Sequence, residues 1–505
     1  MALFVAAVAL RVLGNVPVID LDLFHEMALI REALKLGSLP TEDVFAYTPT
    51  VSPSVHHEWG TGAILYLVTV ALGGGLPGLS LLRLLLLVAI SLSVVAVARH
   101  RGATRTSLIP LAPLAIILFW PGLSPVRAHL FTFTFLGLLL LLLEWDRGGG
   151  RRWIPIWLGL FVVWVNLHGG FVVGLGMLGL YTLERFIRTG SQEGWPETWS
   201  AHGHLVLAIS LSIPLVVVNP YGVNLPIYLW HALLMDRPMI MEWSPIWSED
   251  FRSVALPLFI ASLLILAYTV IRRRGWRQPG ILMVLVAAVV AARSVRILPI
   301  YSVLWLAYVA PALEASPVGP LLKRAWVRHS RLVGGACLLI AVPLLVQAIQ
   351  SKPWSLQIPT ESGVHQPHYP VGAVEYLSQA GFAGNLMTPF RVGAFVSWYL
   401  YPDVLVGLDS RYEVAYPPEF VEEAIRIYNG QGDWEGFMSR HPTDAILVPV
   451  GGPLDSLLVA ETLNSDPHWT QVYRDDGFAI FANPSTASTL PRQDRRGVSI
   501  TPHFP

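Results

Sequence analysis

Long apolar runs alternate with short polar connections over the first 350 residues of the chain. A straight helix crosses a bilayer with about 20 residues, so several of these runs need flanking residues to span. The runs predict a polytopic α-helical membrane domain over residues 1–350, with about 11–13 transmembrane helices. They fall at residues 1–19, 61–76, 79–98, 107–121, 128–144, 153–167, 171–187, 204–219, 254–271, 279–293, 297–313 and 332–349.

The pattern changes after residue 351, where apolar stretches become short and alternate between strand-like and helix-like spacing. Such alternation predicts a small soluble α/β domain over residues 351–483. From Pro484 the chain is rich in Ser, Thr, Pro and Arg, which predicts a disordered tail over residues 484–505. The expected strands are 385–389, 404–408, 444–450 and 478–481, and the expected helices are 393–400, 418–428 and 454–464.

Composition strengthens the membrane prediction. Of the 505 residues, 53% are hydrophobic and 13% are charged, whereas a soluble chain carries about 25% charged residues. The net charge of zero divides unevenly, because residues 351–505 hold 17 acids and 9 bases and residues 1–350 hold 17 acids and 25 bases. Cytoplasmic loops that follow the positive-inside rule account for the basic excess, so no nucleic-acid partner is expected.

The basic connections orient the predicted helices. If they all face the cytoplasm, the helix at 332–349 carries the C-terminal domain to the outer side of the membrane. The same alternation leaves the side of residues 20–60 open. The basic connections are Arg99 to Arg101, Arg147 to Arg152, Arg185 to Arg188, Arg272 to Arg274 and Lys323 to Arg331.

The first long loop, residues 20–60, gathers carboxylates and histidines at the predicted membrane surface. A solvated amphipathic loop is the plain interpretation. The alternative is a general base, or a metal or phosphate site, placed beside a lipid-borne substrate. Its candidate residues are Asp20, Asp22, His25, Asp43, His57 and Glu58.

Further polar residues interrupt the apolar runs on the expected outer side. An Arg at the bilayer centre costs about 2.5–3.5 kcal/mol on insertion scales, so such residues usually face a cavity or a partner. The planar fork of Arg suits a phosphate, whereas snorkelling to the headgroups is the plain interpretation. For His168 a hydrogen-bonded packing role is favoured, and for Asp409 with Arg411 an ion pair within the domain. The candidate substrate-binding residues are Arg127, His129, Asn166, His168, Arg293 and Arg296.

Several short motifs together resemble the GT-C glycosyltransferases, which are polytopic enzymes that use polyprenyl-phosphate sugars. Asp-x-Asp-x-x-His begins at Asp20, Gly-x-x-Pro-x-x-Asp-x-Phe-x-Tyr-Thr begins at Gly37, and Glu58-Trp59 opens the next helix. These motifs are similar to those of a bacterial subgroup of uncharacterised GT-C-like membrane proteins. Other runs that fit are Asn166-Leu-His-Gly-Gly170, Asn219-Pro-Tyr-Gly222, Glu242-Trp243 and Gly407-Leu-Asp-Ser-Arg411.

The resemblance implies transfer of a sugar from a polyprenyl-phosphate donor to a glycan, lipid or protein acceptor at the outer face of a bacterial plasma membrane. It implies that Asp20 or Asp22 activates the acceptor hydroxyl or holds a divalent metal, Mg²⁺ or Mn²⁺, with Glu58 and Asp43 as second carboxylates. Arg127, Arg293 and Arg296 then become contacts for the donor phosphate. The Lys-Pro-Pro-Leu and Trp-Trp-Asp-Tyr-Gly runs of two related branches are absent from the sequence, which leaves the acceptor and the metal open.

A second hypothesis is a protein without enzymatic activity. A transporter, or an envelope-assembly scaffold with a partner-binding outer domain, would have the same hydropathy pattern. Transporters often carry internal repeats, and no repeat is visible in this sequence, which favours the enzyme over the transporter.

Overall fold

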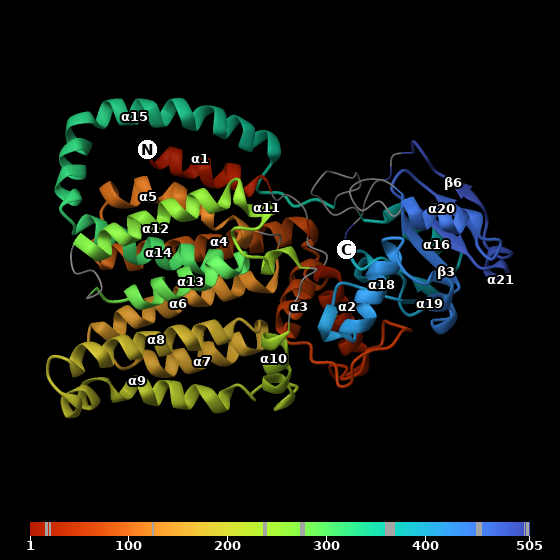
Figure 1. The fold of residues 1–505 in the computed structure, drawn as a ribbon, viewed down its shortest axis with the longest axis horizontal. Helices are drawn as coiled ribbons and strands as arrows, with labels where there is room; N and C mark the ends of the chain where they lie inside the picture. The colour runs from red at the N-terminus through yellow and green to blue at the C-terminus, as the bar shows by residue number, and fades with distance from the viewer. Residues whose placement is uncertain are drawn as a thin grey trace. The chain divides into compact units, whose positions relative to one another are not determined.

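The structure is a computed structural model that describes residues 1–15, 19, 22–123, 126–235, 240–272, 278–358, 369–450, 457–498, 500 and 504. The chain is mainly helical, 67%, and carries a small sheet near its C-terminus (Figure 1). Its contacts divide it into two compact units. Unit 1 comprises residues 1–17 and 80–355, and unit 2 comprises residues 18–79 and 356–505.

Unit 1 is a bundle of apolar helices, and each long apolar run of its sequence forms one (Figure 1). Helix α4 starts in unit 2 and continues into unit 1. Short helical turns, η2 (Trp120–Leu123), η3 (Met241–Trp243), η5 (Val295–Ile297) and α11 (Glu249–Arg252), join the longer helices. The longer helices are α1 (Ala2–Leu13), α4 (Gly75–His100), α5 (Arg105–Leu118), α6 (Ala128–Arg147), α7 (Trp153–Leu167), α8 (Phe171–Gly190), α9 (Trp195–Leu215), α10 (Asn224–Leu234), α12 (Ala255–Arg272), α13 (Ile281–Arg293), α14 (Leu298–Glu314) and α15 (Val318–Ser351).

Helix α14 forms the core of this bundle, since nearly all of its side chains are buried, including Tyr301 and Trp305. It packs against α5, α12 and α13, while α1 packs against α15. Among the described residues, four helices are long and apolar enough to cross a membrane. They are Gly75–His100, Ala128–Arg147, Val295–Glu314 and Val318–Ser351. Six shorter apolar helices accompany them.

The ion pairs described for unit 1 lie at its two ends. The basic connections meet at one end, where carboxylates tie the helices together: Arg101 to Glu144, Lys323 to Glu314, and the backbone N–H of Gly280 to Glu184. The opposite end, where α6 begins, holds Arg127, Glu242 and Arg296. Residues 323–331, which were expected as a basic connection, instead lie inside α15, and residues 273 and 274 of another expected connection lie outside the described residues.

Unit 2 is built on a six-stranded mixed sheet with the order β2-β1-β3-β5-β4-β6. The pairs β1–β2, β1–β3 and β4–β6 are parallel, and β3–β5 and β4–β5 are antiparallel. Strands β3 and β5 are buried along their whole length. The strands are β1 (Gly384–Met387), β2 (Val404–Val406), β3 (Ala445–Pro449), β4 (Thr470–Arg474), β5 (Phe478–Ala482) and β6 (Gln493–Asp494).

Short helices surround this sheet. Helix α17 packs on β2, α16 on β4 and β5, and α20 on β3 and β4. The helices of unit 2 are α2 (Asp22–Leu36), α3 (Trp59–Tyr66), the π-helical turn η1 (Leu67–Ala71), α16 (Val371–Gln379), α17 (Gly393–Leu400), α18 (Pro418–Tyr428), α19 (Trp434–Arg440), α20 (Leu457–Ser465) and α21 (Pro484–Ala487), with η6 (Tyr412–Val414) between them.

The first loop belongs to the sheet unit, which differs from the expected division at residue 350. Residues 45–47 run parallel to β2, where Val406 N donates to Phe45 O (2.9 Å) and Tyr47 N donates to Val406 O (3.2 Å). Phe24 of α2 is fully buried and packs edge-on against Phe395 of α17, with ring centroids 4.9 Å apart. Burial of these loop side chains in the C-terminal unit explains why residues 18–79 group with residues 356–505.

The expected strands of the C-terminal region are present as β1, β2, β3 and β5, and the helices at 393–400 and 418–428 end at the residues predicted. The start of the third expected helix, 454–464, lies partly outside the described residues, which resume with α20. The prediction of a disordered tail is wrong for residues 484–498. They form α21 and then β6, which pairs in parallel with β4.

Candidate active site

A buried arginine joins the first loop to the sheet of unit 2. Asp409 follows β2, at the carboxyl end of two parallel strands, where α/β sheets commonly bind ligands. Arg411 Nε donates to both carboxylate oxygens of Asp409 (2.9 Å each), and its Nη1 is hydrogen-bonded to Asp43 of the first loop. The ion pair expected between Asp409 and Arg411 is therefore present. Its extension to Asp43 is the unexpected part.

The charges of this buried cluster stabilise one another. Burial alone would raise the pKa of Asp409, but the charge and hydrogen bonds of Arg411 outweigh burial and hold that pKa below its usual value. Burial opposes the charge of Arg411 as well, yet Asp409 and Asp43 raise its pKa well above the usual range. The next residue, Tyr412, has a φ of 41°, in the left-handed region that bulky residues rarely adopt. The fixed Arg411 side chain helps to hold this strained backbone.

His25 is the centre of the candidate active site. It lies one turn after Asp22 on α2, so both side chains are on the same face of the helix. Burial lowers the pKa of His25, and the negative charges of Asp22, Asp409 and Glu58 partly oppose that shift. His25 is therefore a neutral imidazole at pH 7 with three carboxylates near it, two from the first loop and one from the sheet.

The end of the first loop contributes His56, His57 and Glu58 to the candidate site. His57 Nε2 lies 3.3 Å from Glu58 Oε1, and both side chains keep partial access to solvent. His56 is buried, and burial followed by the charge of Arg411 lowers its pKa well below the usual value. His56 was not among the predicted site residues. Its position directly before His57-Glu58 is the signal that could have identified it.

The predicted carboxylates differ in their burial and in their partners. Asp22 and Glu58 both act on His25 and are only partly buried. The side chain of Asp43 is fully buried, and its Oδ1 accepts from the backbone N–H groups of Phe45 (2.9 Å) and Ala46 (2.7 Å) while its Oδ2 binds Arg411. Both carboxylate oxygens of Asp43 therefore already have partners within the protein. Asp20 lies outside the described residues.

Two of the predicted substrate-binding residues in unit 1 have packing roles. His168 is buried, and its Nδ1 accepts from Gly170 N (3.0 Å) and bonds Thr132 Oγ1 (2.6 Å). This confirms the hydrogen-bonded packing role favoured for His168. Asn166 Nδ2 donates to the carbonyl oxygens of Val162 and Val218 (2.9 Å each). His129 lies beside Phe133, with ring centroids 5.4 Å apart.

The predicted arginines of unit 1 differ in their contacts. Arg127 and Arg296 share Glu242, at 3.1 Å and 3.3 Å to its two carboxylate oxygens, and Arg296 also lies over the ring of Trp243. Two guanidinium groups and one carboxylate give this group of three side chains a formal charge of +1. Arg293 is exposed at the end of α13.

Among the described residues, no three His, Cys, Asp or Glu side chains are placed to hold a metal ion together. No protein-family model matches the chain, and no curated protein matches its sequence. The chemistry of the site must therefore be argued from these residues.

Proposed function

We propose that the protein is a multi-pass membrane glycosyltransferase, which transfers a sugar from a polyprenyl-phosphate donor to a hydroxyl acceptor at the outer face of a bacterial plasma membrane. The observation that carries this proposal is the shared neighbourhood of Asp22, His25 and Glu58, which come from the two ends of the first loop. The apolar composition and the four long apolar helices support a membrane location for the substrate.

The proposed reaction needs one proton acceptor and good positioning. Asp22 takes the proton of the acceptor hydroxyl, and the oxygen attacks the anomeric carbon of the sugar. The bond from that carbon to the phosphate oxygen breaks, so polyprenyl phosphate leaves with the bonding electrons. Because this leaving group is already a stabilised anion, orientation and charge stabilisation supply most of the rate.

Supporting residues complete the proposal. His25 is neutral at pH 7, so one of its ring nitrogens can donate a hydrogen bond and the other can accept one. It can therefore orient the acceptor hydroxyl while the proton goes to Asp22. Glu58 is the second carboxylate and, with Asp22, the proposed ligand pair for Mg²⁺ or Mn²⁺. The role predicted from the sequence for Arg127, Arg293 and Arg296, contact with the donor phosphate, stays a prediction that rests on the ability of a guanidinium group to bind two phosphate oxygens at once.

The test is donor turnover by the purified full chain, supplied with labelled polyprenyl-phosphate sugars and assayed for release of polyprenyl phosphate. Asp22→Asn should lower turnover by about 10²–10⁴-fold, the usual contribution of a positioned base. Glu42→Gln, an exposed carboxylate of the same loop, is the matched control and should keep the parent rate. Asp20→Asn and chelator treatment followed by added Mg²⁺ or Mn²⁺ test the second acid and the metal.

Parental turnover by Asp22→Asn and by the double variant with Asp20→Asn would overturn the mechanism. A well-folded parent that turns over no polyprenyl-phosphate sugar would instead favour the envelope scaffold.

A further inference from the structure

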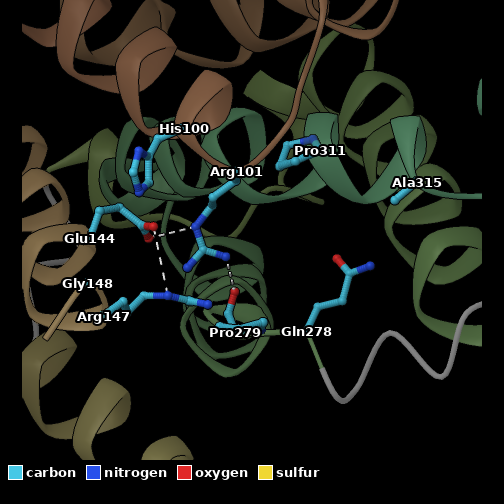
Figure 2. Close-up of a pocket in the computed structure, with 9 residues that line it drawn as sticks. All are labelled: His100, Arg101, Glu144, Arg147, Gly148, Gln278, Pro279, Pro311 and Ala315. Atoms are coloured by element: carbon cyan, nitrogen blue, oxygen red, sulfur yellow. Dashed lines mark hydrogen bonds and ion pairs between the residues drawn. The ribbon is translucent and has the colours of Figure 1, made fainter.

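A cavity with charged walls lies in unit 1, at the end that holds Arg101 and Arg147. Its volume is about 400 Å³, and it is open on one side. The ends of α4, α6 and α14 and the start of α13 surround it (Figure 2). Its polar lining consists of His100, Arg101, Glu144, Arg147 and Gln278.

The two arginines of this cavity share one carboxylate. Arg101 Nε donates to Glu144 Oε1 (2.7 Å), while Arg147 Nε lies 3.8 Å from Glu144 Oε2. Figure 2 shows the contacts from the Glu144 carboxylate to Arg101 and to Arg147 as dashed lines. Two guanidinium groups against one carboxylate leave a formal charge of +1, before any contribution from His100.

Hydrogen-bond donors remain unused in this cluster. The side chain of Arg101 is 10% exposed, and Arg101 Nη2 and Arg147 Nη1 are buried without an acceptor among the described residues. Arg101 Nη1 already donates to Pro279 O (2.7 Å), and its guanidinium lies over the ring of Tyr308. Buried donors are normally paired, so unpaired ones on two neighbouring cations indicate an anion that belongs between or beside them.

A purely structural role accounts for only part of this arrangement. Arg101 and Arg147 each stand at the C-terminal end of a helix, where a cation is favourable. That role explains the positive charge. It does not explain why two like charges share a single carboxylate beside a cavity large enough for a small ligand.

We propose that this cavity binds a phosphoryl group through Arg101 and Arg147. The paired forks match the oxygens of a phosphate, and Glu144 fixes both arginines in place through its two carboxylate oxygens. The phosphoryl group comes either from a soluble phosphorylated compound or from a phospholipid headgroup. The site involves only residues of unit 1, so it stands or falls independently of the glycosyltransferase proposal.

Two probes separate the sources. In detergent solution, inorganic pyrophosphate is titrated into the full chain by calorimetry. In nanodiscs of phosphatidylcholine with phosphatidylglycerol, the phosphatidylglycerol retained by the protein is measured by native mass spectrometry. Arg147→Gln is the test variant, and Arg152→Gln is the matched control, an exposed arginine at the far end of the same connection that does not line the cavity.

Arg147→Gln should weaken binding of the effective probe by about 10-fold or more, as expected for a lost charge-assisted bond. Arg152→Gln should change it by less than about twofold. Arg147→Lys, which keeps the charge and loses the fork, should fall between them and guards against misfolding of the first variant. Arg147-dependent pyrophosphate binding identifies a soluble ligand, and Arg147-dependent phosphatidylglycerol alone identifies a headgroup. Equal losses in the two Gln variants, or no binding of either probe, would overturn the site.

Discussion

The two buried charge clusters of this protein use the same groups in opposite proportions. In unit 2, two carboxylates enclose one arginine, and Asp43, Asp409 and Arg411 each have side chains at most 1% exposed. In unit 1, two arginines share Glu144, and the exposed fractions of Arg101 and Arg147 are 10% and 23%. In the first cluster the Arg411 donors and the carboxylate oxygens bind one another and nearby backbone. In the second cluster, Arg101 Nη2 and Arg147 Nη1 have no acceptor among the described residues.

This difference teaches how to separate a structural cluster from a binding cluster. A closed cluster holds two chain segments together, and removal of one partner leaves an uncompensated buried charge. A cluster with surplus donors beside a cavity already contains repulsion, so removal of one cation is inexpensive until a ligand is present. The following measurements test that distinction.

The largest effect is expected for Arg411→Met. This change leaves Asp43 and Asp409 buried without their cation, which typically costs about 3–5 kcal/mol. Hydrogen exchange of the β1 and β3 amides in the full chain should therefore become about 100-fold faster or more. Arg426→Met, an exposed arginine on α18, is the control. Equal protection in the two variants would show that the Arg411 cluster does not hold unit 2 together.

An effect of intermediate size on the stability of unit 2 is expected when the pH is lowered. The pKa of His56 lies well below its usual value in the folded protein, so the unfolded chain takes up this proton at a higher pH than the folded protein does. The free energy of unfolding is therefore at its full value above about pH 6.5 and decreases as the pH falls below that value. Each such histidine contributes about 1.4 kcal/mol per pH unit. Asp409 acts in the same direction below about pH 4, because its folded pKa is also lowered.

The measurement is the protection of β1 and β3 against pH, corrected for intrinsic exchange. His56→Asn should lower the slope between pH 6.5 and 5 by about 1.4 kcal/mol per pH unit. His468→Asn, with a side chain 83% exposed, should keep the parental slope. An unchanged slope in His56→Asn would mean that His56 is protonated in the folded state as easily as in the unfolded chain.

The smallest effect is expected for Arg147→Gln without ligand. Glu144 keeps its short bond to Arg101, and one like-charge contact disappears, so the free energy of unfolding should change by about 1 kcal/mol or less. Protection of the last turns of α6 is the readout. A loss as large as that of Arg411→Met would make this second cluster structural and would abolish the contrast between the two.

The hydropathy pattern predicted most of the helices and four of the strands, because burial and period are local properties of the sequence. Strand β4 was not predicted, since Thr470 to Arg474 mixes polar and apolar residues and is a strand only through its pairing with β5. The role of Asp43 was equally inaccessible. Its partner Arg411 is 368 residues away, and no local pattern indicates that a first-loop acid will form an ion pair with an arginine of the sheet unit.

The candidate site shows the same division. The sequence predicted residues 20–60 only as a loop, and helix α2 was needed to place Asp22 and His25 on one face. The prediction that they matter for catalysis awaits the turnover assay. The cluster around Glu144 was interpreted only as basic connections. Glu144 stands at the end of an apolar run, and this position indicated a buried charge that the overall composition did not reveal.

The division of unit 2 between residues 18–79 and 356–505 has a consequence for biosynthesis. The ribosome adds the roughly 280 intervening residues at about 5–20 residues per second, which takes about 15–60 s. During that interval Phe24, Phe45 and Asp43 have been made, but Phe395 and Arg411, on which they pack in the finished protein, do not yet exist. The nascent first loop must therefore be shielded from premature pairing or proteolysis, and a C-terminal fragment beginning at residue 356 would be translated without the segment that completes its sheet edge and its buried charge.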